Sequence, residues 1–340
     1  MSEIEAKLDS KRQVIEIPPI KPKYIEYQRF SKQCGCGHEQ YGEYPEYITN
    51  HIQYGPSVEA MSGYYSVYQY LPFNRMKQMF SQIFNLPLSE GTLVNIVEKL
   101  SKKAQPIYEE IRTFIENSNS VVGDETGIKV NGDKWWGWIW QNIHASYISI
   151  TSNRASQTIN ESFPRGFPNA ILNSDRWRPH LSTKAQGHQL GIAHLLRDLN
   201  YLIELEQTQW AKEMKKLFQA ALKLKREKQE YQKESPPTVK IELKADKLLE
   251  EILNKADTPK TLVFKNAMKT HRQSLFRFLY HKEVPPDNNG SERGVRNFKV
   301  KQKISGQFKT GQNAYATLRS VIDTSIKRNI PVMQSMKLIA

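Results

Sequence analysis

Residues 121–130 (VVGDETGIKV), 134–143 (KWWGWIWQNI) and 145–153 (ASYISITSN) decide the fold of this chain. β-Branched and aromatic residues, which favour strands, fill all three runs. Turn-forming residues separate the runs, first Asn131-Gly132-Asp133 and then His144-Ala145. The sequence therefore predicts three consecutive β-strands.

Three tryptophans occupy alternate positions of the second predicted strand. Trp136, Trp138 and Trp140 therefore share one face of that strand. Such a row belongs more often to a protein core than to a surface that stacks on bases. We expect these indoles to be buried, whereas Lys134 and Trp135, at the start of the strand, are better placed to meet DNA.

The residues that follow the third strand extend the pattern. RASQTINESF at 154–163 favours a helix, AILNSDRW at 170–177 a short apolar strand ending in an aspartate, and HQLGIAHLLRDLNYLIEL at 188–205 a helix. The order is β-β-β-α-β-α, with carboxylates at the ends of the first and fourth strands. This is the layout of a ribonuclease H-like fold, so we predict an α/β protein of that class.

Changes in composition divide the rest of the chain. Apolar positions recur at helical spacing before the strands, and a strongly charged helical pattern follows them from about Glu204 to Tyr280. The predicted parts are an extended leader (1–32), a zinc-finger-like segment (33–52), a helical domain (53–117), a ribonuclease H-like domain (118–310) with a helical insertion at about 205–285, and a C-terminal helix (311–340).

The charge of the chain favours a polyanionic partner. Among 340 residues, 49 Lys and Arg face 35 Asp and Glu, a formal net charge of +14. Nucleic acid and an anionic membrane surface are the two candidates. No run of about 18 apolar residues occurs, and the first residues lack the apolar core of a signal peptide. We expect a cytoplasmic, nucleoid-associated protein with no membrane partner.

Three acidic residues are candidate metal ligands. Asp124 and Asp175 each follow an apolar run, which predicts that both stand at strand ends, and Glu292 begins a predicted helix. Carboxylates brought together repel one another unless a cation or proton neutralises them, and hard oxygen ligands suit Mg²⁺ or Mn²⁺. Any single acid of this kind is more often a turn residue, a helix cap or a surface charge.

Cations surround Glu292 on the same predicted helix. A helix that projects one carboxylate towards the sheet and cations along its length would present a metal site and a phosphate-binding surface together. The predicted DNA contacts on this helix are Arg293, Arg296, Lys299, Lys301 and Lys303.

Cys34, Cys36 and His38 form a C-x-C-x-H motif. The cysteines are one residue apart, which is too close for an ordinary disulfide and tighter than the spacing of a usual zinc finger. A zinc site also needs a fourth ligand, for which His51 is the candidate. Structural Zn²⁺ and a degenerate or vacant site are both open, and the second is favoured.

Residues 75–100 have the pattern of a helix-turn-helix. A turn at residues 85–88 separates two helical runs, and Ser89 is a suitable cap for the second helix. An exposed side of that helix would carry Thr92, Asn95 and Lys99 and could contact DNA. An ordinary helical hairpin fits the pattern equally well.

Several ordered motifs resemble the transposases of insertion-sequence family 66. They are GDETGIKVNGDKWWGWIW, LNSDRW, GHQLGIAHLLRDL and NNGSERGVRNFKVKQKISGQF, preceded by CGCGHEQYGEYPEYITNHIQYGPSVEAM and YLPFNRMKQMFSQIFNLPLSEGTLVN. The resemblance extends from about Cys34 to Phe308, and the order of the motifs makes it specific.

The resemblance implies a D-D-E transposase whose acids are Asp124, Asp175 and Glu292. Two Mg²⁺ or Mn²⁺ ions would assist hydrolysis at the element ends and then attack of the freed 3′-hydroxyl on target DNA. The implied partners are double-stranded DNA at element ends and target, further copies of the chain assembled on that DNA, and accessory proteins of the same element.

The chain departs from the family pattern at two places. Gly191 stands where members usually carry a cysteine, three residues before His194, so His188 and His194 are expected to order the surroundings of Asp175 without a thiol. Relatives often have a further segment before the zinc region. Two alternatives therefore stay open: a nuclease or junction resolvase that cuts without joining, and a truncated, non-catalytic DNA-binding protein derived from a transposase.

Overall fold

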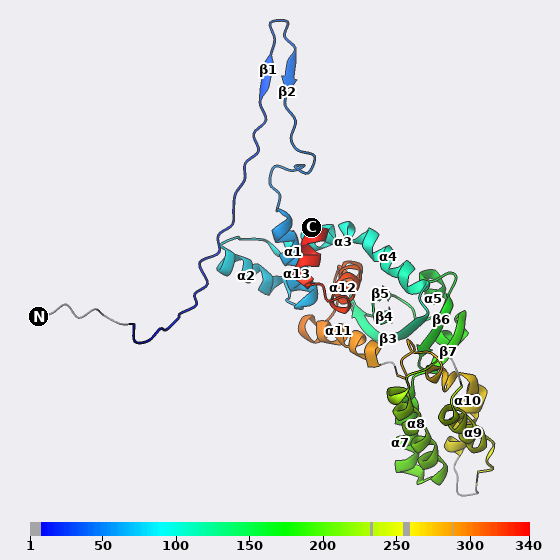
Figure 1. Ribbon diagram of the computed structural model, residues 1–340. Coiled ribbons are helices and arrows are strands. Elements are labelled where there is room, and N and C mark those ends of the chain that lie inside the picture. Colours follow the sequence, from blue (N-terminus) through cyan, green and yellow to red (C-terminus); the bar gives the residue numbers. More distant parts are fainter. Residues whose placement is uncertain (1–7, 232–233, 254–258, 288) are drawn as a thin grey trace, which may run out of the picture.

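The computed structural model describes residues 8–231, 234–253, 259–287 and 289–340. A mixed β-sheet forms the centre of the molecule, and helices cover both of its faces (Figure 1). A long N-terminal arm with a hairpin projects from one side of this body. A separate group of helices, α7 to α10, projects from the other side. The chain is therefore a mixed α/β protein, as predicted.

Five strands form the central sheet in the order β5-β4-β3-β6-β7. The first three strands pair antiparallel, whereas β6 pairs parallel to β3 and β7 parallel to β6. The prediction of three consecutive strands is confirmed. The strands are β3 (Ser120–Val130), β4 (Asp133–Gln141), β5 (Ser146–Thr151), β6 (Phe167–Ser174) and β7 (Ala185–Leu190).

The helix predicted from His188 begins later than expected. Residues 185–190 form β7 at the edge of the sheet, and α7 (Ile192–Glu206) begins only after Gly191. The run AQGHQL has few β-branched residues, so its strand conformation comes from pairing with β6 rather than from local preference. The order of elements is therefore β-β-β-α-β, then the short α6 (Arg178–Ser182), then β-α.

Tight turns connect the antiparallel strands. Asn131 and Gly132 have φ values of 50° and 90°, as a two-residue hairpin turn between β3 and β4 requires. Between β4 and β5 the side-chain oxygen of Asn142 accepts hydrogen bonds from the backbone N–H groups of His144 and Ala145. Both turns lie where the sequence predicts them.

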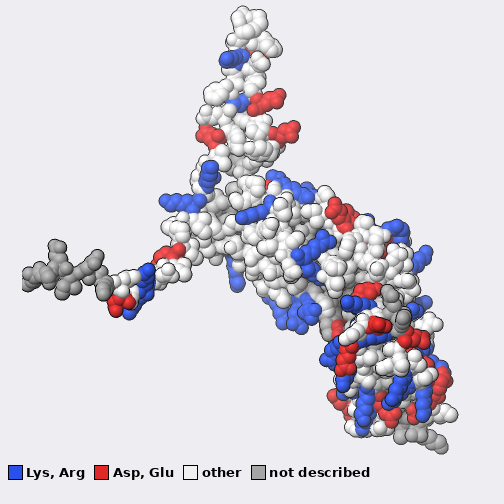
Figure 2. Space-filling view, viewed as in Figure 1, with Lys and Arg blue, Asp and Glu red and all other residues white. Residues whose placement is uncertain are grey.

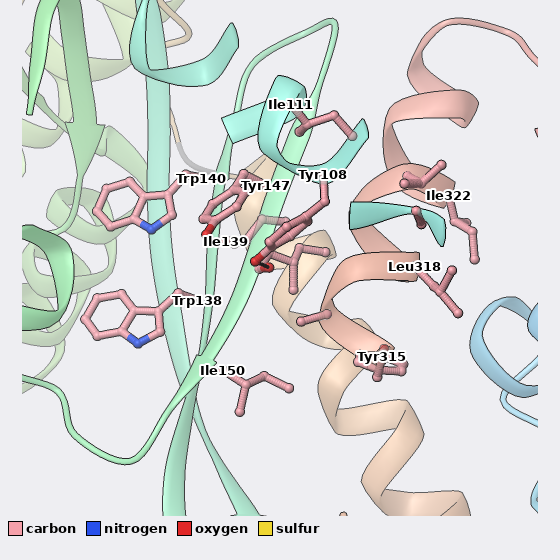
Figure 3. Close-up of a cluster of buried hydrophobic side chains, with 14 of the residues drawn as sticks. Tyr108, Ile111, Trp138, Ile139, Trp140, Tyr147, Ile150, Tyr315, Leu318 and Ile322 are labelled. Carbon is pink, nitrogen blue, oxygen red and sulfur yellow. Dashed lines mark hydrogen bonds between the residues drawn. The ribbon is translucent and has the colours of Figure 1, made fainter. Parts of the chain in front are cut away.

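The tryptophan row of β4 belongs to the core. Trp138 and Trp140 are each 1% exposed, and they lie on the opposite side of the sheet from Ile139 (Figure 3). Trp140 packs against Phe163 and Phe167, near α5 (Ser156–Ser162) and at the start of β6. The prediction that these indoles are buried is confirmed, with Trp136 only partly covered.

Helices α11 (Asn289–Ser305) and α12 (Gln312–Lys327) cover the other face. Ser320 and Thr324 of α12 accept hydrogen bonds from the backbone N–H groups of Ile148 and Ser146, on the free edge of β5. An edge strand left unpaired would invite pairing with another chain, and α12 prevents this.

The prediction of a single C-terminal helix over residues 311–340 is wrong. Two helices are present, α12 and α13 (Val332–Ile339), because Asn329 adopts a left-handed conformation and Pro331 precedes the second helix. Since α12 is buried along most of its length, this segment is part of the sheet's core.

Two further groups of helices pack outside the sheet. Before the sheet come α1 (Pro56–Gly63), the π-helix η1 (Tyr64–Tyr68), α2 (Phe73–Phe84), α3 (Glu90–Lys103) and α4 (Gln105–Glu116). After α7 come α8 (Gln209–Glu227), α9 (Pro236–Glu250), α10 (Pro259–Thr270) and two 3₁₀ turns, η2 (Arg272–Ser274) and η3 (Arg277–Leu279), which share a core of their own.

The cysteine segment forms a hairpin of β1 (Ser31–Gln33) and β2 (Glu39–Tyr41), and its two cysteines are disulfide-bonded. The expectation that Cys34 and Cys36 lie too close for a disulfide is wrong. A tight turn, in which Gly37 has a φ of 86°, leaves their Cα atoms 5.3 Å apart, within the usual range for such a bond. With this bond formed, neither sulfur is a thiolate that could bind zinc.

Gly166, directly before β6, lies in close contact with the backbone of Lys184, and a substitution there tests whether this contact matters for stability. It has a φ of 66°, and a Cβ atom there would lie 2.3 Å from the backbone oxygen of Lys184. We expect Gly166→Ala to lower the free energy of unfolding by more than the roughly 1–2 kcal/mol of left-handed strain alone. Gly306→Ala is the matched control, because Gly306 has a φ of 77° and open space around it. Equal losses in urea unfolding would contradict this account.

Candidate active site

Asp124 lies inside β3, as its fifth residue, and not at a strand end as the sequence predicts. The strand continues to Val130 because β4 pairs with it from Val122 to Val130. The pairing with β6, by contrast, covers only residues 120–122. Asp124 therefore stands just beyond the parallel part of the sheet, on a strand whose backbone is fixed from the other side.

The register between β3 and β6 places Asp175 level with Asp124. Every pair along this ladder, such as Ser120 and Ile171, is 51 residues apart (171 − 120). The two aspartates have the same separation (175 − 124), and Asp175 directly follows the last residue of β6. Continued two residues past this ladder, the register aligns Asp124 on β3 with Asp175 just beyond β6. The carboxylate of Asp175 also contributes to the raised pKa of Asp124, so the predicted pair of aspartates lies close together.

Local hydrogen bonds orient the Asp175 side chain. Its Oδ1 atom accepts from the backbone N–H of Trp177 at 3.0 Å and from His180 Nδ1 at 3.2 Å. The short helix α6 begins at Arg178, with Pro179 in its first turn, and this local turn brings His180 back to Asp175. His180 is fully buried, so the Asp175 carboxylate is hydrogen-bonded to a side chain that is shielded from water.

Helix α11 is docked onto the same end of the sheet. Ser291 Oγ accepts from Gln141 Nε2 at 3.0 Å and lies 3.4 Å from the carbonyl oxygen of Val122. The segment before the helix is held by Asn173, whose Nδ2 donates to the carbonyl oxygen of Pro285 at 2.7 Å. Contacts to β3, β4 and β6 therefore fix where the first turn of α11, with Glu292, begins.

Glu292 faces His194 and Arg197 and not the aspartates. Its Oε1 atom lies 3.6 Å from His194 Nε2 and 3.4 Å from Arg197. His194 is also close enough to Asp175 to lower the pKa of that carboxyl, so it lies near both acids. Over the described ranges, no three His, Cys, Asp or Glu side chains are grouped as a ready metal site.

The two aspartates differ in their pKa values. Burial, reinforced by the nearby carboxylate of Glu125, raises the pKa of Asp124 to about 7. Burial also acts to raise the pKa of Asp175, but the hydrogen bond and electrostatic interaction with His180, together with the hydrogen bond from the Trp177 backbone, outweigh burial, and the pKa is lowered. A cation placed beside the two aspartates would therefore stabilise the ionised form of Asp124 more than that of Asp175.

A divalent cation fits this pair of side chains. Asp124 and Asp175 supply hard oxygen donors from adjoining strands, and the negative neighbours that raise the pKa of Asp124 would be neutralised by the ion. Glu292 could join them if its side chain left His194 and Arg197. Mg²⁺ and Mn²⁺ are the ions whose chemistry matches such a donor set.

Two buried residues of this region are missed by the sequence analysis, namely Glu125 and His180. Glu125 pairs with Trp138 in the sheet and therefore shares the tryptophan face, opposite to Asp124. Its carboxylate binds Arg154 and approaches His180. The alternation of side chains along β3 could have shown that Glu125 points into the core and needs a partner there, but the sequence cannot name that partner.

Most of the predicted cationic contacts lie on the surface of α11. Four of them are exposed: Arg293, Arg296, Lys299 and Lys303. Figure 2 shows Lys and Arg side chains gathered over this helix. Lys301 differs, because it turns inward towards the carbonyl oxygen of Ser66, and burial lowers its pKa to about 8.

The predicted helix-turn-helix has the expected backbone. Helices α2 and α3 are joined by a short turn, and Ser89 caps α3 by accepting a hydrogen bond from the backbone N–H of Thr92. Thr92 Oγ1 also bonds Ser89, and Lys99 neutralises the buried Glu59. Of the three predicted contacts, only Asn95 is an exposed side chain for which the described part of the chain shows no such bond.

Of the two histidines expected to order the surroundings of Asp175, the structure places only His194 there. His188 lies within β7, and burial lowers its pKa. It pairs with Leu172 in the sheet, two positions before the end of β6. His194 is the one that contacts Glu292.

The fold and site define a mixed α/β protein with paired aspartates beside a basic helix. A family model described as Transposase IS66 family matches residues 51–316. The chain therefore belongs to the IS66 family of transposases, which implies a DNA substrate. A search of curated proteins found no match. Throughout the residues that the structure describes, every helix is too short or too polar to cross a membrane.

The pKa of Asp124 predicts how stability depends on pH without divalent metal. Its pKa is about 7 in the folded chain and about 3.9 when unfolded, so the favourable contribution is present below pH 4 and is lost as pH rises through 7. We expect Asp124→Asn to be more stable than the unmodified chain at pH 8, by at most about 4 kcal/mol, and to lose this advantage at pH 4.5.

Urea unfolding in EDTA at both pH values measures this difference. Asp133→Asn, at the exposed first residue of β4, is the control for a general change in charge. An advantage of Asp124→Asn that is the same at both pH values would contradict the assignment of the raised pKa to Asp124.

Proposed function

We propose that this chain is a D-D-E transposase that cuts element ends and joins them to target DNA, with Asp124, Asp175 and Glu292 as its metal-binding acids. The observation that supports the proposal is the register of β3 and β6, which, continued two residues past the ladder, aligns Asp124 with Asp175. A helix that bears Glu292 is docked over the same end of the sheet.

The sheet supports the proposal of a ribonuclease H-like fold. Three antiparallel strands come first, the first of them is central, and the fourth strand pairs parallel to it. The aspartates lie on the first strand and directly after the fourth. That is the arrangement expected from the order of elements in the sequence, with one further parallel strand at the edge.

In this mechanism the carboxylates of Asp124 and Asp175 would hold the cation, and Glu292 would complete the donor set from α11. When bound, two divalent ions supply Lewis-acid stabilisation for the attacking and leaving oxygens of the phosphodiester. Arg197 and His194, which face Glu292, are released to bind phosphate when Glu292 moves. The same acids serve hydrolysis at the element end and transfer of its 3′-hydroxyl.

The exposed cations of α11 are the proposed contacts to the DNA backbone. Arg293, Arg296, Lys299 and Lys303 extend from the first turn that carries Glu292, so a duplex lying along them reaches the aspartates. Recognition of the element ends is assigned to α3, with the exposed side chain of Asn95 as its proposed contact. Joining requires two ends together, so we propose that copies of the chain assemble on DNA.

Cleavage and strand transfer on labelled DNA that carries the element's own ends, with Mg²⁺, test this function. We expect joined products from the unmodified chain, and a loss of at least about 100-fold in Asp124→Asn, Asp175→Asn and Glu292→Gln, because each change removes several kcal/mol of charge stabilisation. Asp133→Asn, outside the site, should retain activity.

The other outcomes separate the alternatives. Cleavage without joined product would indicate a nuclease on the same fold. Tight binding to the ends without any Mg²⁺-dependent product would indicate a non-catalytic DNA-binding protein, and the proposed function would be wrong.

A further inference from the structure

A buried polar chain runs beneath Asp175 to the far face of the sheet. It begins at Asp175, passes through the imidazole of His180 to Glu125, and ends at Arg154. His180 is fully buried, and the side chain of Glu125 is 2% exposed. Burying charged groups this deeply costs folding free energy unless they are paired. Their presence among buried tryptophans therefore suggests that they have a role beyond stability.

Only one of the two carboxylate oxygens of Asp175 accepts hydrogen bonds from the described residues. In the described part of the chain, both hydrogen bonds to its carboxylate, from Trp177 and His180, go to Oδ1. A carboxylate fixed through one oxygen cannot rotate freely about its last bond. Oδ2 is therefore the oxygen held out for a ligand, on a side chain that stands level with Asp124.

Aromatic rings fix the orientation of His180. The rings of Trp138, Trp140 and Trp177 lie 5.2–6.2 Å from the imidazole, each meeting it edge to face. Such packing on three sides leaves the imidazole one plane, in which Nδ1 faces Asp175 and Nε2 faces Glu125. By fixing the plane of the imidazole, the tryptophans also fix the direction from which His180 contacts Asp175.

Glu125 and Arg154 complete the support on the far side. His180 Nε2 lies 3.2 Å from Glu125 Oε2, and among the described residues neither atom has a hydrogen-bond partner, so this contact is a close approach of the two polar groups. Arg154 Nε donates to Glu125 Oε1 at 2.8 Å, and its guanidinium lies between the rings of Trp136 and Trp177. Glu125 is therefore anchored by Arg154, and His180 lies between the carboxylates of Glu125 and Asp175.

We propose that His180 is a positioning residue that locks the Asp175 carboxylate, through its Nδ1–H, with Oδ2 directed to a divalent cation shared with Asp124. The proposal rests on the proposed metal-dependent function and adds a residue to it. Residues that hold a metal ligand in place typically change metal affinity by 10–100-fold when they are altered.

Two isosteric replacements separate positioning from packing. In His180→Asn the amide nitrogen takes the place of Nδ1 and still donates to Asp175, whereas in His180→Gln it takes the place of Nε2 and reaches only Glu125. Calorimetric titration of the full chain with Mn²⁺ should give a Kd within about threefold of the unmodified chain for the Asn variant. The Gln variant should bind 10–100-fold more weakly.

Cleavage as a function of Mn²⁺ concentration provides a second readout. The Gln variant should need more Mn²⁺ for half-maximal rate and recover its rate at saturation, which a general loss of packing would not do. Thermal midpoints of both variants, measured without metal, set the temperature at which each is titrated.

The possible results bear on different parts of the account. Equal Mn²⁺ affinity of the Asn and Gln variants, or no recovery at saturating Mn²⁺, would overturn the role of His180 alone. If the unmodified chain showed no Mn²⁺ binding that Asp124→Asn abolishes, the proposed function and this role would both fall.

Discussion

Three residue pairs, from Ser120 and Ile171 to Val122 and Asn173, join β3 to β6 in parallel. This short ladder sets two carboxylates at adjoining positions, one of them inside a strand. The arrangement is unfavourable in itself, because burial and neighbouring charge raise the pKa of Asp124 to about 7. A penalty of at most about 4 kcal/mol must therefore be offset elsewhere in the fold.

The tryptophan face of the sheet provides that compensation. Trp138 and Trp140 each bury roughly 200 Å² of mostly apolar surface, or about 5 kcal/mol per indole as an upper value. On the opposite face, α12 covers the free edge of β5 and α11 is docked by Ser291. The strands that carry the acids are thus immobilised from both sides, which is what a preorganised ionic site requires.

Periodicity predicts the parts of this protein whose structure is local. The three antiparallel strands, their turns and the buried indoles follow from alternation and turn residues. The parts that depend on distant partners do not. Strand β7 forms because it pairs with β6, and Asp124 lies inside β3 because β4 pairs with that strand. The contact of His180 with Asp175 depends on the local turn at helix α6. The paired aspartates were predictable as residues, but their register was not.

The central claim is that Asp124 and Asp175 hold one divalent cation. The most direct test is a crystal of the full chain soaked in Mn²⁺, with data collected where Mn²⁺ scatters anomalously. The account predicts an anomalous peak about 2.0–2.2 Å from a carboxylate oxygen of each aspartate, with Oδ2 as the ligand from Asp175. A fully soaked crystal with no peak between the two side chains, or with peaks only elsewhere, would contradict it.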